Sequence, residues 1–183
     1  MNVKRFIENI VEQIKEAQLK LGYVKEVIRL YYQAESLCDL LELPYQDGKE
    51  LLLVLEKETD FLDTELGKIG FSLCHDQNRI EVRISPDGTE YVHKYVQAPP
   101  FLAGLIQLFQ EHHKLSIEEI CAYFERFSEH YICEKMQPGT DFDYVMYFED
   151  QKPDSWYYCI RTEMDHTIYH RFTKSDYSKI VDK

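Results

Sequence analysis

Apolar residues in the first third of the chain recur at three- and four-residue steps, the spacing of one helix face. Over residues 3–21 this spacing predicts a helix that Gly22 can end in left-handed geometry. It predicts a second helix over residues 24–41 and a third over residues 47–66. The apolar run 51–55 would also suit a buried strand, but the helical spacing after it favours the helix. We therefore expect three helices before the pattern changes.

The pattern then alternates with a period of two, which is typical of strands with one covered face. It predicts strands at residues 69–73 and 80–84. Pro86-Asp87-Gly88 reads as a tight turn, because proline fixes one dihedral angle and glycine permits positive φ. Residues 89–96 are then expected to return as a third antiparallel strand.

Two more helices are predicted in the middle of the chain. Pro99-Pro100 opens the first, where a missing proline N–H does no harm. Ser116 and Glu119 form a capping box that starts the second. We expect this second helix to run through Tyr131 to the breaker at residues 137–139.

The last third again favours strands, at residues 144–148, 155–163 and 167–172, before a short terminal helix. The whole order predicts an α+β fold, with N-terminal helices and two antiparallel three-stranded meanders separated by a helical pair. Whether the two meanders form one sheet is left open. We expect a single domain over residues 1–183, with 1–98 and 99–183 as its sub-lobes.

Two distant segments share a tyrosine–histidine–basic–aromatic signature. They are Tyr91-Val92-His93-Lys94-Tyr95 and Tyr169-His170-Arg171-Phe172. Each is predicted to close a strand, and an offset of about 78 residues aligns several nearby positions as well. An internal duplication and a chance match are both open readings of this pattern.

Composition narrows the classes of partner. A net charge of −12, spread along the chain, argues against binding a phosphate backbone, which needs clustered lysine and arginine. Five scattered cysteines without a C-x-x-C pair favour a reducing, cytoplasmic setting, and no apolar run is long enough to span a membrane. Seven glycines without a phosphate-binding motif leave no cofactor to expect.

The predicted sheet face is the leading candidate for function. If Ile80, Val82 and Ile84 point to the core, Glu81 and Arg83 point away from it. The expected ligand-binding set gathers the signature residues with a nearby arginine: Tyr91, His93, Tyr95, Arg161, Tyr169, His170 and Arg171. Tyrosine and arginine dominate binding hot spots, so such a face suits a partner protein or a small anionic or aromatic ligand. Ordinary cross-strand pairing explains the same residues, and homo-oligomerisation is left open.

The competing hypothesis is a hydrolase-like or metal-assisted enzyme. It would use His93 and His170 with nearby carboxylates, or a zinc-like group of His112, Cys121, His130 and Cys133. Histidines near a helix end also favour the helix dipole, and Cys121 falls on an apolar stripe, so structural roles account for these residues too.

Two stretches of the chain are Asn78-Arg79-Ile80-Glu81-Val82-Arg83-Ile84-Ser85-Pro86-Asp87-Gly88 and Trp156-Tyr157-Tyr158-Cys159-Ile160-Arg161. Together with the order of segments, they resemble a bacterial family defined only as a domain of unknown function. The resemblance covers nearly the whole chain. It implies a small standalone cytoplasmic bacterial protein and carries over no catalytic residue.

Overall fold

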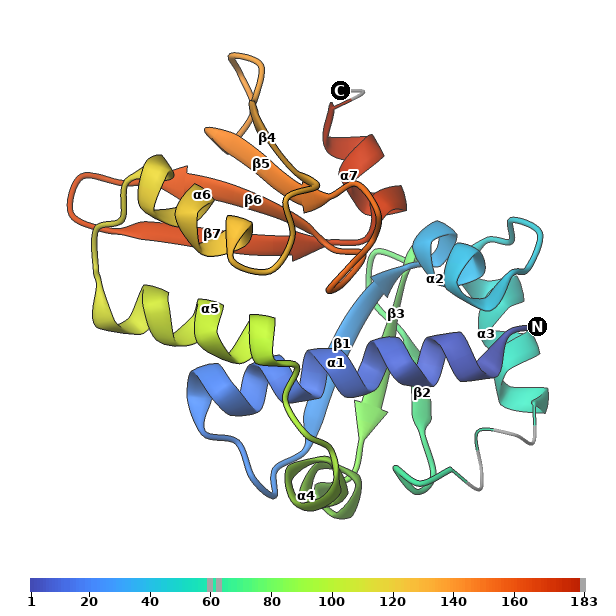
Figure 1. Cartoon of the computed structure of the whole chain (residues 1–183). Helices are drawn as coiled ribbons and strands as arrows, with labels where there is room; N and C mark the ends of the chain where they lie inside the picture. The colour runs from blue at the N-terminus through green and yellow to red at the C-terminus, as the bar shows by residue number, and fades with distance from the viewer. Residues whose placement is uncertain (59–60, 62–63, 182–183) are drawn as a thin grey trace. The chain divides into compact units, whose positions relative to one another are not determined.

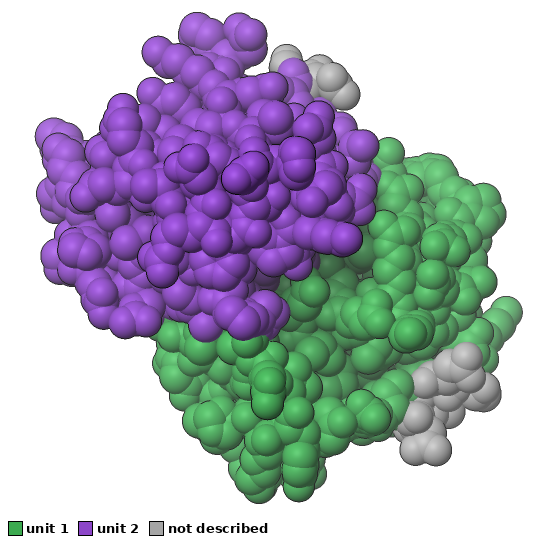
Figure 2. Space-filling view, viewed as in Figure 1, with its two compact units in different colours: residues 1–98 green, residues 99–183 purple. Residues whose placement is uncertain are grey.

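The computed structural model describes residues 1–58, 61 and 64–181. Two compact units divide the chain, Met1–Ala98 and Pro99–Lys183, and each is described by itself (Figure 2). Helices and antiparallel sheets occur in both units, so the α+β class is confirmed. Among the described residues no helix is long and apolar enough to cross a membrane.

The first predicted helix is confirmed as α1, Val3–Leu21. Asn2 caps it by accepting a hydrogen bond from the Arg5 N–H, and Gly22 ends it at φ 72°. Its inner stripe includes the fully buried Phe6, whose ring meets Tyr32 and Phe71 from two strands. The helix therefore covers one face of the first sheet (Figure 1).

The single helix predicted over residues 24–41 is wrong. Strand β1, Ile28–Gln33, comes first, and the shorter helix α2, Ala34–Leu41, follows it directly. Ile28 and Tyr32 lie four residues apart, and that spacing shares one face in a helix and in a strand alike. Alternation decides the matter, because residues 29, 31 and 33 between and after them are exposed.

Helix α3, Gly48–Lys57, confirms the first half of the helix predicted over residues 47–66. Asp47 caps it through the backbone N–H groups of Lys49 and Glu50. The rest of that prediction falls partly outside the described residues.

Strands β2, Gly70–Leu73, and β3, Arg79–Ile84, lie where alternation predicts them. The sheet has the order β1-β3-β2 and is antiparallel throughout. Its core face, packed with the helices, is completed by Ile80, Val82 and Ile84, all fully buried.

The third strand predicted over residues 89–96 is wrong, because residues 86–95 form helix α4, Pro86–Tyr95. Ser85 caps the helix by accepting from the Gly88 N–H at 3.2 Å, and Pro86 occupies the first turn. A Cβ on Gly88 would lie 2.2 Å from the Leu66 carbonyl oxygen. Glycine therefore serves close backbone packing here, and the expected turn is a helix start.

In the second unit, α5, Pro100–Glu111, and α6, Ile117–Glu125, form the expected helical pair. The capping box of Ser116 and Glu119 is confirmed in both of its hydrogen bonds. The predicted continuation of α6 through Tyr131 is wrong, because the chain leaves the helix and forms β4, Tyr131–Lys135.

The strands β5, Tyr144–Phe148, β6, Tyr157–Thr162, and β7, Thr167–Phe172, confirm the predicted final meander, followed by α7, Lys174–Val181. With β4 added, this sheet has four strands in the order β4-β5-β6-β7. It is separate from the first sheet.

The second sheet has one face covered by α5 and α6 through an aromatic core. Phe101 is 1% exposed and its ring lies 5.0 to 5.6 Å from five others: Tyr123, Phe124, Phe127, Phe148 and Tyr158. On the opposite face α7 covers a smaller cluster, in which Tyr157 stacks between Tyr147 and Tyr177.

The two signature segments do not repeat one structure. Tyr91, His93 and Tyr95 lie on helix α4, whereas Tyr169, His170 and their neighbours lie on strand β7. Strand and helix direct these side chains differently, so the local structure contradicts an aligned repeat of the two segments.

Candidate functional site

The first sheet has a face that the helices leave uncovered. Because β-strand side chains alternate, every second residue of β1, β2 and β3 points away from the core. We call this set the open face; its members are Arg29, Tyr31, Gln33, Gly70, Ser72, Arg79, Glu81 and Arg83. The sequence-based expectation that Glu81 and Arg83 point away from the core is confirmed.

Register places two arginines of the open face directly opposite one another. Arg29 pairs across the ladder with Arg83, and Tyr31 pairs with Glu81. Both Arg29 and Tyr31 are 56% exposed. Like charges opposite each other in a sheet are destabilising, so this arrangement needs an explanation beyond strand pairing.

Glu81 lies at the centre of the open face. Its carboxylate is 3.6 Å from the Nε of Arg29 and accepts a hydrogen bond of 3.3 Å from the Tyr31 hydroxyl. At the far end of the same strand, Asp76 pairs with Arg79, which lowers the pKa of the aspartate and raises that of the arginine. These two carboxylates thus each engage one arginine.

Arg83 is the arginine of the open face for which the described residues provide no ion pair. Its side chain lies across Gly70, where a Cβ would be 3.5 Å from the Arg83 Nε. A Cβ at that distance would make only ordinary van der Waals contact, so the Arg83 side chain lies against β2. Arg83 is thus an exposed cation that no described carboxylate pairs with, and a second arginine lies opposite it.

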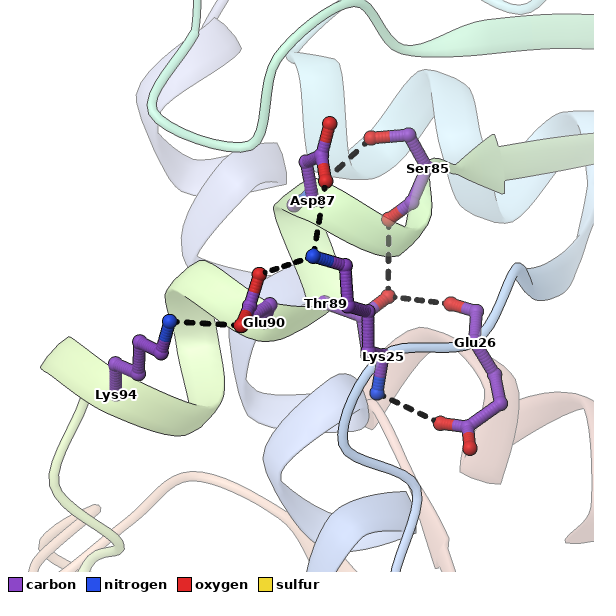
Figure 3. Close-up of polar contacts among 8 residues, drawn as sticks. Lys25, Glu26, Ser85, Asp87, Thr89, Glu90 and Lys94 are labelled. Atoms are coloured by element: carbon purple, nitrogen blue, oxygen red, sulfur yellow. Dashed lines mark hydrogen bonds and ion pairs between the residues drawn. The ribbon is translucent and has the colours of Figure 1, made fainter.

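A second polar cluster joins the loop after α1 to helix α4 (Figure 3). Lys25 donates to Glu90 at 2.7 Å, and Lys94 donates to the other oxygen of the same carboxylate at 2.7 Å. These two hydrogen bonds lower the pKa of Glu90 to about 2. The Thr89 hydroxyl, fully buried, lies 2.8 Å from the Glu26 carbonyl oxygen. This cluster is internally neutralised and holds a loop, so it is a structural feature.

The expected site residues of the first unit lie on the C-terminal half of α4. Tyr91 donates to the carboxylate of Glu65 at 2.8 Å, which raises its pKa, and its ring lies 5.2 Å from Tyr95. His93 is exposed, and Tyr95 is 72% exposed. They are helix residues and do not form part of a sheet face.

The expected site residues of the second unit point to opposite sides of the second sheet. Tyr169 is 7% exposed and packs edge-on against Phe109, and on the same side Arg171 lies 4.4 Å from the ring of Trp156. His170, on the other side, packs with the rings of Phe142 and Phe172.

Arg161 is on the same sheet, and its Nε is 3.3 Å from a carboxylate oxygen of Glu163. Since Tyr169 and Arg171 alternate with His170, the expected polar-aromatic set does not share one face of this sheet.

The residues of the zinc-like alternative are also dispersed. His112 is the C-terminal cap of α5, and His130 lies in the loop before β4. In the part of the chain that the structure describes, no three His, Cys, Asp or Glu side chains group closely enough to hold a metal ion. Cys121 and Cys133 do lie near one another, close enough for Cys121 to raise the pKa of Cys133.

Sequence reasoning missed Arg29 and Tyr31, because it placed both on a helix. The signal was present, since exposed Arg29, Tyr31 and Gln33 alternate with apolar Ile28, Leu30 and Tyr32. Alternation over six residues is typical of a half-buried strand.

Comparison with known proteins identifies the family without assigning an activity. A family model described as a domain of unknown function, DUF3877, named for an E. rectale gene, matches residues 3–181. No curated protein and no solved structure matches the chain. The resemblance inferred from the sequence is confirmed at this level: the chain belongs to the DUF3877 family.

Proposed function

We propose that this protein is a binding module that docks a short acidic segment of a partner protein on the open face. The observation that supports this most directly is Arg83, an exposed arginine without an ion pair among the described residues, directly opposite Arg29. An incoming carboxylate would relieve the repulsion between the two cations. Arginine pairs well with carboxylates because its planar guanidinium can donate two parallel hydrogen bonds.

The kind of occupant follows from shape and charge. Small-molecule sites are usually concave, whereas protein interfaces are flatter and enriched in tyrosine and arginine. The open face is an uncovered sheet surface on which Tyr31 lies beside Arg29 on β1 and opposite Glu81 on β3. A long polyanion such as nucleic acid would also meet the rest of a chain whose net charge is −12. A short acidic peptide needs only the local positive charge.

Fluorescence anisotropy with a fluorescein-labelled ten-residue peptide rich in glutamate tests this proposal. We expect saturable binding that weakens with salt, and a loss of about tenfold or more in the Arg29→Gln/Arg83→Gln variant, because each charge-assisted hydrogen bond is worth roughly 1.5–3 kcal/mol. Circular dichroism verifies that the variant is folded.

The matched control is Lys49→Gln/Lys57→Gln, which removes the same charge from exposed positions of α3. It should bind as the wild type does. The proposal is wrong if the peptide does not bind, if the control loses as much affinity as the arginine variant, or if a single-stranded oligonucleotide of equal charge binds more tightly.

A further inference from the structure

The second unit contains a pair of thiols from different elements that meet. Cys121 lies on α6 and Cys133 on the edge strand β4, and the two thiols lie close enough for Cys121 to raise the pKa of Cys133. The Tyr131 hydroxyl lies near the same Cys121 sulfur, which adds to the effect of burial in raising the pKa of the tyrosine. Both cysteines are half-buried and neither is in a disulfide, so the pair is reduced and partly accessible.

The other cysteines of the chain do not share this arrangement. Cys38 and Cys159 are buried, and Cys74 lies just after β2 in the first unit. For Cys121 and Cys133 the meeting follows from the fold, because α6 packs on the sheet face to which Cys133 points, beside Tyr131 and Phe124. Such contact is the geometric precondition of a disulfide, which needs a sulfur–sulfur bond of about 2.05 Å with little backbone movement.

We propose that Cys121 and Cys133 form a reversible disulfide that links α6 to β4, with a small-molecule disulfide as the oxidant. The Cys121 sulfur, as thiolate, attacks one sulfur of the oxidant R–S–S–R, forming a mixed disulfide and releasing one thiolate RS⁻. The Cys133 sulfur, after losing its proton, attacks the Cys121 sulfur and releases the second RS⁻. The two protein protons end on the two released RSH molecules, so the protein is oxidised by two electrons and the oxidant is reduced by two.

The surroundings assign the two roles. Burial, followed by the neighbouring Cys121 thiol, raises the pKa of Cys133 to about 12. Because the raised pKa keeps Cys133 protonated, we assign the first attack to Cys121. Glu118 and Glu134 are close enough to oppose a thiolate at Cys133. Cys133 is thus suited to the second, intramolecular step, where proximity compensates for its weak acidity.

Peptide mapping by mass spectrometry on the full chain tests this proposal. The protein is incubated with hydroxyethyl disulfide, blocked with iodoacetamide and digested without reduction. We expect a cross-linked peptide pair containing Cys121 and Cys133, which a phosphine reductant converts back to two thiol peptides. Adducts at Cys74 alone, or a wild-type digest without the cross-link, would overturn the proposal.

Single variants separate the two steps. Cys133→Ser should stop at a mixed disulfide on Cys121, because the resolving thiol is missing. Cys121→Ser should leave Cys133 largely unmodified, since it is the poorer nucleophile. Fluorescence of Trp156 and circular dichroism establish that each variant is folded, and the wild-type mapping stands whether or not they are. An equal adduct at Cys133 in Cys121→Ser would contradict the assigned order.

Discussion

Replacing Glu81 by glutamine should strengthen the binding of an acidic peptide to the open face. The substitution keeps the size of the side chain and leaves an oxygen that can accept the Tyr31 hydrogen bond. It removes the carboxylate that now lies 3.6 Å from Arg29, and so frees that guanidinium for an incoming anion. A gain in affinity is informative, because partial unfolding would produce a loss.

The expected size follows from Coulomb's law. A carboxylate of the peptide bound between Arg29 and Arg83 would lie about 5 Å from Glu81, where two like charges in water repel by about 0.8 kcal/mol. Screening reduces this to about 0.7 kcal/mol at 10 mM salt and about 0.4 kcal/mol at 0.15 M. Affinity should therefore rise about threefold at low salt and about twofold at the higher salt.

The assay is the anisotropy titration of the labelled glutamate peptide at both salt concentrations, with wild type and Glu81→Gln side by side. Urea unfolding should show that the variant is less stable by about 0.2–1 kcal/mol, the usual worth of a partly exposed ion pair. Binding that is unchanged or weaker at 10 mM salt would refute the reasoning. A gain that did not shrink with salt would also contradict it, because the effect would then not be electrostatic.

Two further predictions concern stability. In the folded protein the pKa of Glu90 is about 2, below its ordinary value of 4.5, so its stabilising effect is present above pH 4.5 and lost as pH falls towards 2. Acid titration followed by circular dichroism should therefore show a shallower loss of stability over that range in Glu90→Gln than in wild type. Phe101→Ala should cost about 3–5 kcal/mol, whereas Phe127→Ala, already 38% exposed, should cost less than half as much, measured by urea unfolding with Trp156 fluorescence. Similar costs for the two phenylalanines would contradict the central place of Phe101.

The elements that could be predicted from sequence are those specified by local signals. Helix α1 ends where Gly22 adopts left-handed geometry, and α6 begins at the capping box of Ser116 and Glu119. Both signals act within four residues and do not depend on the rest of the fold. The β3 alternation was equally clear, because its buried and exposed positions match the two faces of a covered sheet.

The errors arose where local patterns are compatible with two structures. The sequence Pro86-Asp87-Gly88 suits a tight turn, yet proline in the first turn after Ser85 suits a helix start equally well. The choice depends on Gly88 packing against Leu66, a contact between segments 22 residues apart. Such tertiary packing cannot be read from the local composition.

The candidate site, like the fold, could be predicted only where local signals specify it. Sequence alternation correctly directed Glu81 and Arg83 away from the core, but Arg29 joins them only through strand pairing across more than fifty residues. The tyrosine–histidine signature does not form one sheet face, because Tyr169 and His170 are neighbours on one strand and face opposite sides. The similar sequences of the two segments did not imply similar local structure.

The open face can be distinguished from an ordinary sheet surface by the relation between stability and binding. If the charges of the open face served strand pairing, removing Arg83 would destabilise the first unit. The ladder neighbours of Arg83, however, are Gly70, which has no side chain, and Arg29, which repels it. Arg83 therefore contributes little to folding by its own contacts. Glu81 does stabilise the face and at the same time competes with an acidic ligand. Stability and affinity should thus change in opposite directions at Glu81, and affinity alone should change at Arg83, a pattern that a purely structural role would not produce.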